Sequence, residues 1–96
     1  MLDKIKLSMR IFHNVLDSDI ESNIDACMLD LQRVGVNKKH AVATSTDALI
    51  CKAAELFCKW QNDFNGKGDQ YQKAYEKLRD AISLCDTYAE SGDANV

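Results

Sequence analysis

The chain has 96 residues, of which 46% are hydrophobic and 28% charged, with a formal net charge of -3 and a pI near 5.2. This length suits one domain around a single core, and the composition excludes a disordered or fibrous chain. The acidic balance argues against a dedicated nucleic-acid binder, and no apolar run has the length of a signal peptide or membrane span, so we expect a cytoplasmic protein.

The first segment, residues 4–11, gives two conflicting patterns. Apolar side chains alternate with lysine, serine and arginine, which is strand periodicity, yet Leu2, Ile5 and Met9 also fit one face of a short helix. No second alternating run exists to pair with a strand, and an isolated strand leaves its backbone groups unsatisfied. We therefore expect a short N-terminal helix.

A clearer helix is predicted over residues 18–34. Ser18 and Glu21 form a capping-box pattern, and apolar residues then follow at helical spacing until Gly35. Leu29 lies off this apolar stripe. It is a candidate for contact with another chain, although a single exposed leucine is also ordinary.

The next segment, residues 36–45, has no helical pattern and holds Lys38, Lys39 and His40 together. One interpretation is an ordinary solvated loop. The other is a contact loop, because loops of about ten residues in compact domains often carry binding functions. We favour the contact loop.

The most apolar helix is predicted over residues 46–64, where hydrophobic side chains sweep more than half of the helical wheel. Thr44, Ser45 and Thr46 offer N-cap oxygens, while Asp47 suits the positive end of the helix dipole. We expect this helix to be central, with Trp60 in the middle of the core.

A third long helix is predicted over residues 69–88, with Tyr88 in its last turn, and forms an antiparallel hairpin with the central helix. The sequence thus predicts an all-α fold: a small bundle of three main helices in a domain of residues 1–88. Residues 89–96 offer little to bury, and we expect a flexible tail that orders on a partner. Its Ser91, Asp93 and Val96, with Tyr88 before them, are further interface candidates.

No catalytic or metal-binding pattern emerges. There is no glycine-rich phosphate loop or histidine-centred triad, and helix capping explains Asp17 and Asp19. The four cysteines form no C-x-x-C pair and are expected on or beside apolar helix faces, as buried reduced thiols: Cys27, Cys51, Cys58 and Cys85. We expect no cofactor.

Three stretches carry a resemblance that covers nearly the whole chain: KLSMRIFHNVLDSDIESNIDACMLDLQRVGV, STDALICKAAELFCKW and DQYQKAYEKLRDAISL. In order, spacing and length they resemble the small head-tail connector (adaptor) proteins of long-tailed bacteriophages. The matching parts are the segment 9–11 before an acidic helix start, the helix end at 30–36, the apolar helix from Asp47, and the run 74–78.

The resemblance implies a structural protein rather than an enzyme. Such proteins form a closed ring beneath the portal protein, and the resemblance implies about twelve copies. The ring extends the DNA channel and provides the docking surface for a stopper or tail-completion protein. The implied location is the head-tail joint of the virion, with assembly in the host cytoplasm, and DNA passes through the channel without specific binding.

Two other classes stay open. One is a small DNA-binding protein in which helices 18–34 and 46–64 form a helix-turn-helix, although the connecting loop is long for that motif and a basic recognition helix is missing. The other is a regulatory domain that binds one protein partner.

Overall fold

The computed structural model describes residues 1–10, 17–85 and 87–88. Within these residues it contains four α-helices, one 3₁₀ turn and no strand. The helices are α1 (Leu2–Ser8), α2 (Asp17–Arg33), α3 (Ala48–Gln61) and α4 (Gly68–Ser83), with the 3₁₀ turn η1 (Phe64–Gly66) before α4. The predicted all-α bundle, with its short N-terminal helix, is confirmed.

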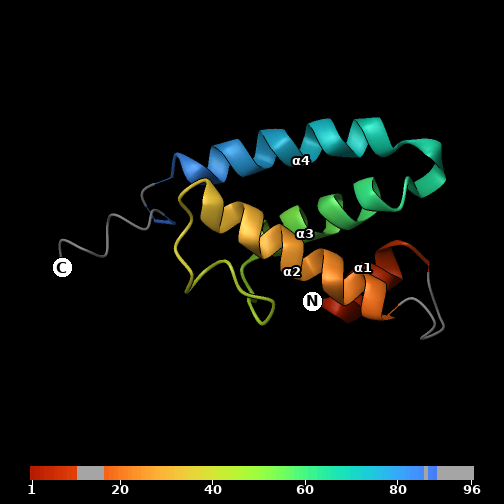
Figure 1. Ribbon diagram of the computed structural model, residues 1–96, viewed down its shortest axis with the longest axis horizontal. Helices are drawn as coiled ribbons and strands as arrows, with labels where there is room; N and C mark the ends of the chain where they lie inside the picture. Colours follow the sequence, from red (N-terminus) through yellow and green to blue (C-terminus); the bar gives the residue numbers. More distant parts are fainter. Residues whose placement is uncertain (11–16, 86, 89–96) are drawn as a thin grey trace.

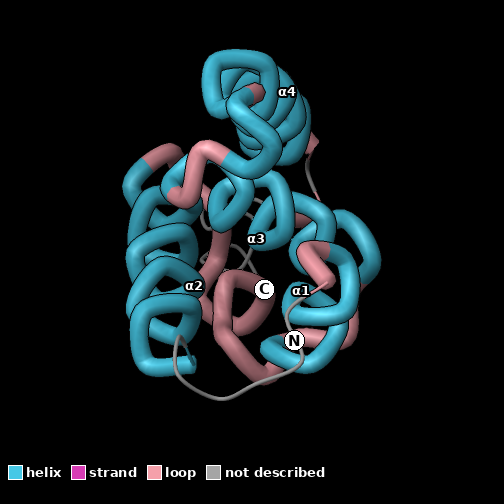
Figure 2. Tube along the Cα trace, turned by 90° about the vertical axis from the view of Figure 1, so that its right-hand side faces the viewer, coloured by secondary structure: helices cyan, strands magenta, loops and turns pink. Residues whose placement is uncertain are grey.

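The helix α3 is the middle layer of the fold. It packs against α2 on one side and α4 on the other, and α1 contacts both α2 and α3. In Figures 1 and 2, α4 lies above α3, and Figure 2 shows α2 and α1 on two other sides of α3, with the loop that follows α2 between them. The outer side of α4 and the underside of α1 and α2 are therefore opposite surfaces of the molecule.

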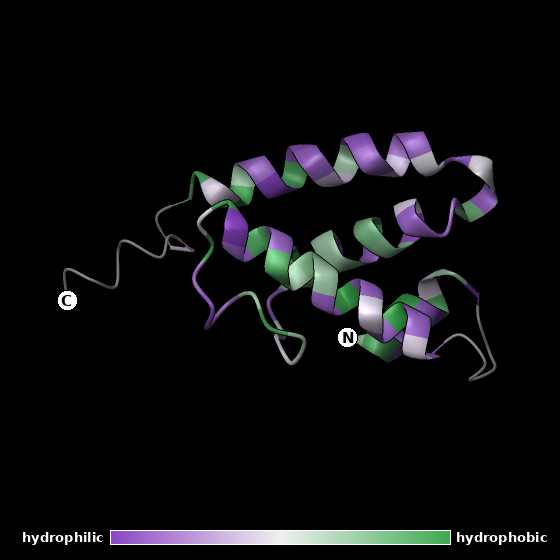
Figure 3. Ribbon diagram, in the orientation of Figure 1, coloured by the Kyte–Doolittle hydropathy of each residue, from purple (hydrophilic) through white to green (hydrophobic). Residues whose placement is uncertain are grey.

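Burial of α3 explains its central position. The helix is pale to green along its length in Figure 3, whereas α4 is mostly purple. Its buried residues are Ile50, Ala53, Ala54, Phe57 and Cys58. Trp60, expected in the middle of the core, is only partly buried and packs at its edge. The largest fully buried side chain is instead Tyr75 of α4.

Both ends of α3 differ from the prediction by a few residues. Asp47 itself is the N-cap, accepting hydrogen bonds from the amides of Leu49 and Ile50. The helix ends at Gln61 because the chain turns into left-handed conformations at Asp63 and Asn65. The Asp63 carboxylate then accepts the amide hydrogen of Gly68, the first residue of α4, at 2.7 Å.

The prediction that α4 continues to Tyr88 is wrong. The helix ends at Ser83, and Tyr88 lies in a turn beyond it. The chain leaves the helix because Tyr88 is held against the loop after α2: its carbonyl accepts the Asn37 amide hydrogen at 2.7 Å. The predicted flexible tail, residues 89–96, lies outside the described residues.

The N-terminal helix α1 spans Leu2–Ser8, so the helical interpretation of this segment is confirmed. Its Ile5 is buried, and Lys6 forms an ion pair with Asp17 at 2.8 Å between Nζ and Oδ1. That contact holds α1 to the start of α2, which begins one residue before the predicted Ser18.

The cysteines are reduced, and two of them are core residues. Cys27 and Cys58 are buried, and burial raises the pKa of each thiol to about 12. Such thiols are inert toward oxidants and metals. Cys51 is half-buried, but Cys85 is exposed because it follows the end of α4, so its expected place on an apolar helix face is wrong.

Candidate interaction surfaces

The basic loop, defined as residues 36–45, is anchored at several points. Val36 and Ala41 are fully buried, and the Gln32 side-chain amide donates to the Ala41 carbonyl at 3.1 Å. Between these anchors, Lys38 and Lys39 are exposed in a turn. The loop therefore holds Lys38 and Lys39 on a fixed backbone.

Tyr88 is the third anchor of the basic loop. Its hydroxyl donates to Asp47 Oδ2 at 2.8 Å, and its ring meets the His40 ring edge-on with 5.1 Å between centroids. The hydrogen bond from Tyr88 lowers the pKa of Asp47. The same bond raises the pKa of Tyr88 to about 12. Tyr88 thus joins the basic loop to the N-terminal end of α3.

The sequence-predicted interface residues fall into three groups. Lys38, Lys39 and His40 lie together on the basic loop, with His40 half-buried against Tyr88. Leu29 stands apart on α2 and is 66% exposed. Tyr88 is 8% exposed, and its ring and hydroxyl are engaged inside the chain. Three candidates lie outside the described residues: Ser91, Asp93 and Val96.

A polar cluster that the sequence did not reveal links α2 to α4. Asp30 accepts the hydroxyl hydrogen of Tyr75 at 2.7 Å and also pairs with Arg33 and Arg79 at 2.7 and 3.3 Å. Burial alone would raise the pKa of Asp30, but the hydrogen bonds from these three groups outweigh it and lower the pKa. Only the Asp30–Arg33 spacing could have been read from the sequence.

Three exposed leucines were also missed. Leu7 is 67% exposed, Leu49 is 45% exposed, and Leu84, just after α4, is 84% exposed. The periodicity of a helix does not separate a core leucine from one at the edge of the apolar face. Together with Leu29, these side chains place apolar contact points on several sides of the molecule.

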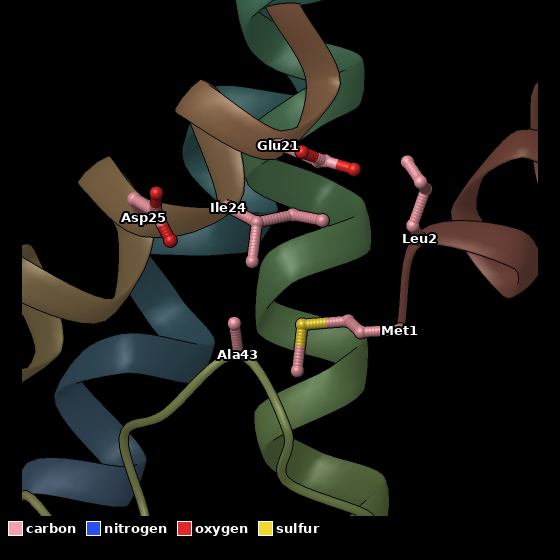
Figure 4. Close-up of a pocket in the computed structure, with 6 residues that line it drawn as sticks. All are labelled: Met1, Leu2, Glu21, Ile24, Asp25 and Ala43. Atoms are coloured by element: carbon pink, nitrogen blue, oxygen red, sulfur yellow. The ribbon is translucent and has the colours of Figure 1, made fainter. Parts of the chain in front are cut away.

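An open pocket lies between α1, α2 and the basic loop. Its volume is about 300 Å³, and its lining residues are Met1, Leu2, Glu21, Ile24, Asp25 and Ala43. In Figure 4, α2 contributes Glu21, Ile24 and Asp25, while Met1, Leu2 and Ala43 face the same space from the other two segments. The pocket thus combines an apolar lining with two carboxylates.

No group of three metal-ligating side chains occurs within the residues that the structure describes. Likewise, none of the described helices has the length and apolar character needed to cross a membrane.

The described domain is a small helical bundle with an anchored basic loop, a pocket lined by two carboxylates, and exposed leucines on several elements. The chain matches the family model for Phage connector protein over residues 1–89. It belongs to that family, as the sequence resemblance predicted. Neither the curated proteins nor the solved structures contain a match to the chain. Membership assigns it to the structural proteins of the phage head-tail joint, which contact other head and tail proteins.

Proposed function

We propose that this protein is the subunit of a ring that sits beneath the portal protein of a phage head, extends the DNA channel, and provides the docking surface for a stopper or tail-completion protein. The single observation that carries this proposal is the family match, which spans the whole described domain. The subunit assembles in the host cytoplasm and remains in the virion.

Contact points on several sides of the domain support a ring subunit. A subunit in a closed ring needs one surface for each neighbour, and in this position it also needs one for the portal and one for the next component. Leu7, Leu29, Leu49 and Leu84 project from different elements, and the basic loop presents Lys38 and Lys39 at another place. The chain thus has candidate residues for more than one partner.

The charge of the chain is compatible with a DNA channel. A net charge of -3 does not favour strong binding to phosphates, and a lumen lined by many cations would retard sliding DNA. The rival interpretation as a helix-turn-helix protein requires a tight turn between α2 and α3. Residues 34–47 separate these helices, and that segment carries buried anchors of its own.

Binding to portal-bearing heads tests the proposal. The purified full-length chain is mixed with DNA-filled heads that lack connector and tail, and bound copies are located by electron microscopy. We expect a ring of about twelve copies at the portal vertex. Absence of density at that vertex would overturn the proposal. Binding to naked duplex DNA that weakens steeply with salt would favour the DNA-binding alternative.

A further inference from the structure

Two pairs of like charges lie at i, i+4 spacing on the surface of the molecule. Glu21 and Asp25 lie on α2, and Lys73 and Lys77 lie on α4; all four are exposed. None of their four side chains takes part in a hydrogen bond or ion pair within the described residues. By contrast, other carboxylates are internally paired: Asp17 with Lys6, Asp30 with Arg33 and Arg79, and Glu55 with Lys52 and Lys59.

The two pairs match in spacing. Each consists of residues i and i+4 of a helix, which places their side chains one above the other, with about 5–6 Å between Cβ atoms. The distance between the two carboxylates on α2 therefore matches the distance between the two ammonium groups on α4. The two like charges of each pair repel each other.

The two pairs lie on opposite surfaces of the protein. The acidic pair borders the pocket below α3, between α1, α2 and the basic loop. The basic pair lies on α4, which Figure 2 places above α3, and it occupies the side of α4 away from the buried Tyr75 and Ile82. Complementary surfaces on opposite sides of one subunit are what a head-to-tail contact between identical copies requires.

The pocket beside the acidic pair has the chemistry to receive a lysine. Its apolar wall, from Leu2, Ile24 and Ala43, suits the four methylene groups of a lysine stem. The carboxylates of Glu21 and Asp25 line the same pocket and suit the ammonium group at the end of that stem.

We propose that the α2 face of one copy, with Glu21 and Asp25, binds the α4 face of a second copy, with Lys73 and Lys77. This inference rests on the proposed function in one respect, because it names the contact that joins neighbouring subunits of the ring. A parallel alignment of the two helices places Glu21 opposite Lys73 and Asp25 opposite Lys77.

The same alignment is supported by the uncharged residues on the two faces. With that register, the exposed Ser22 lies opposite the exposed Ala74, and the exposed Leu29 lies opposite the exposed Ala81. Small residues allow the helices to approach each other, and Leu29 then covers apolar surface. This gives the sequence-predicted contact role of Leu29 a specific partner.

Exposed ion pairs are individually weak and are screened by salt. A contact built largely from them forms poorly between two free copies. It becomes effective when the portal holds many copies side by side, because each further contact is then intramolecular. The contact therefore belongs to the assembled ring and weakens as ionic strength rises.

Charge reversal tests the contact with two complementary variants. The first carries Glu21→Lys and Asp25→Lys, so both faces are positive; the second carries Lys73→Glu and Lys77→Glu, so both are negative. The matched control carries Asp19→Lys and Lys67→Glu, which reverse exposed, unpaired charges elsewhere. Circular dichroism of each variant first establishes that the helices form.

Loading onto portal-bearing heads is then measured at low and high salt. Each variant alone should load about tenfold more weakly than the wild-type chain. An equimolar mixture of the two should recover loading, because positive and negative copies alternate around the ring. Wild-type loading by either variant alone, or no recovery in the mixture, would overturn the contact.

A second measurement separates this inference from the proposed function. The two variants are mixed without any portal at low salt and examined by sedimentation equilibrium. At low salt we expect weak association in the mixture and in the control, because both keep oppositely charged faces, and none in either variant alone. If the wild-type chain does not bind heads yet the mixture associates, the ring beneath the portal is wrong and the contact stands. If the wild-type chain binds heads, but the mixture neither recovers loading nor associates without the portal, only the proposed contact is wrong.

Discussion

Two tyrosine–aspartate pairs hold distant parts of this chain together, and they do so in different surroundings. Tyr75 and Asp30 join α4 to α2, with 2.7 Å between the hydroxyl and Oδ2. Tyr88 and Asp47 join the end of the described chain to the start of α3, at 2.8 Å. The bond lengths are alike, so the difference between the pairs lies in what surrounds them.

The first pair is part of the core. The Tyr75 ring is fully buried and meets the rings of Phe57 and Trp60 at centroid distances of 5.1 and 6.1 Å. Its hydroxyl is excluded from water, so it needs Asp30 as its hydrogen-bond acceptor. Two arginines hold that carboxylate ionised. The hydrogen bond between Tyr75 and Asp30 thus helps to hold α2 and α4 against the same core.

The second pair fixes a loop at the edge of the core, because Tyr88 is itself a buried member of the core cluster. The Tyr88 ring is 8% exposed and contacts His40, whereas Asp47 also caps α3 through two backbone amides. Loss of this pair leaves Asp47 with other donors and leaves the helices packed. The comparison teaches that the same hydrogen bond can stabilise the whole fold in one place and order an interaction loop in another.

The largest effect is expected from Tyr75→Ala. Removal of a fully buried aromatic ring leaves a cavity among Phe57 and Trp60, so the free energy of unfolding should fall by about 3–5 kcal/mol. Urea unfolding measures the change. Tyr88→Ala is the matched control and should lower the free energy of unfolding by clearly less, because Tyr88 lies at the edge of the core. Equal losses would remove the distinction between the two pairs.

Asp30→Ala should lower the free energy of unfolding by a smaller amount. The buried Tyr75 hydroxyl loses its acceptor, at a cost of about 1–3 kcal/mol. Because the pKa of Asp30 is lowered in the folded state, its stabilisation is fully present above the unfolded value of about 3.9 and is lost as pH falls through the lower folded value.

The pH dependence can be measured directly. Urea unfolding midpoints of the wild-type chain and of Asp30→Ala should converge as the pH falls from neutral into the acid range. A stability difference that stays constant down to strongly acidic pH would mean that the ionised carboxylate is not what holds Tyr75.

Tyr88→Phe should lower the free energy of unfolding by still less, about 0.5–1.5 kcal/mol, because only one part-buried hydrogen bond is lost. The amide of Asn37 should then exchange its hydrogen faster, since its acceptor is the Tyr88 carbonyl. The helix α2 serves as internal reference. Unchanged exchange at Asn37 would show that Tyr88 does not anchor the basic loop.

Alkaline pH offers a second measurement of the same pair. The hydrogen bond to Asp47 raises the pKa of Tyr88 from 10.0 to about 12. The resulting stabilisation is fully present below pH 10.0 and is lost as the pH rises toward about 12. The wild-type chain and Tyr88→Phe should therefore become equally stable over this interval.

Deletion of Ser91 through Val96 should change stability least. The sequence of this segment offers too little apolar area to offset the backbone entropy of about 1–2 kcal/mol per residue. We predict an unchanged melting temperature and weaker binding to the portal. A large drop in melting temperature would show that the tail packs on the domain, and unaltered portal binding would refute its role as a contact.

Local patterns were enough to predict the helices but not their connections. Helical spacing and caps located α2, α3 and α4, because these signals lie within a few residues of each other. Tyr88 was placed on a helix because its spacing continues the apolar stripe of α4. Its actual partners, Asn37 and Asp47, are remote in sequence, and no local pattern reports them.

The exposure of some interface candidates was predicted, whereas their role in contacts stays a prediction. Lys38, Lys39 and Leu29 were recognisable as polar loop residues and as an off-stripe leucine, and all three are exposed. The pocket beside Glu21 and Asp25 could not be predicted, because it forms only where α1 and the basic loop approach α2. The sequence alone does not distinguish a charged residue that forms an ion pair within the fold from one that stays unpaired at the surface.

The central claim is that this chain joins the phage head to its tail. Electron microscopy of particles produced by a phage that lacks only this chain tests it most directly, with the chain supplied in trans as the control. We predict separate heads and tails, with joined particles restored by the supplied chain. Full heads with tails attached, in the absence of the chain, would contradict its role as a connector.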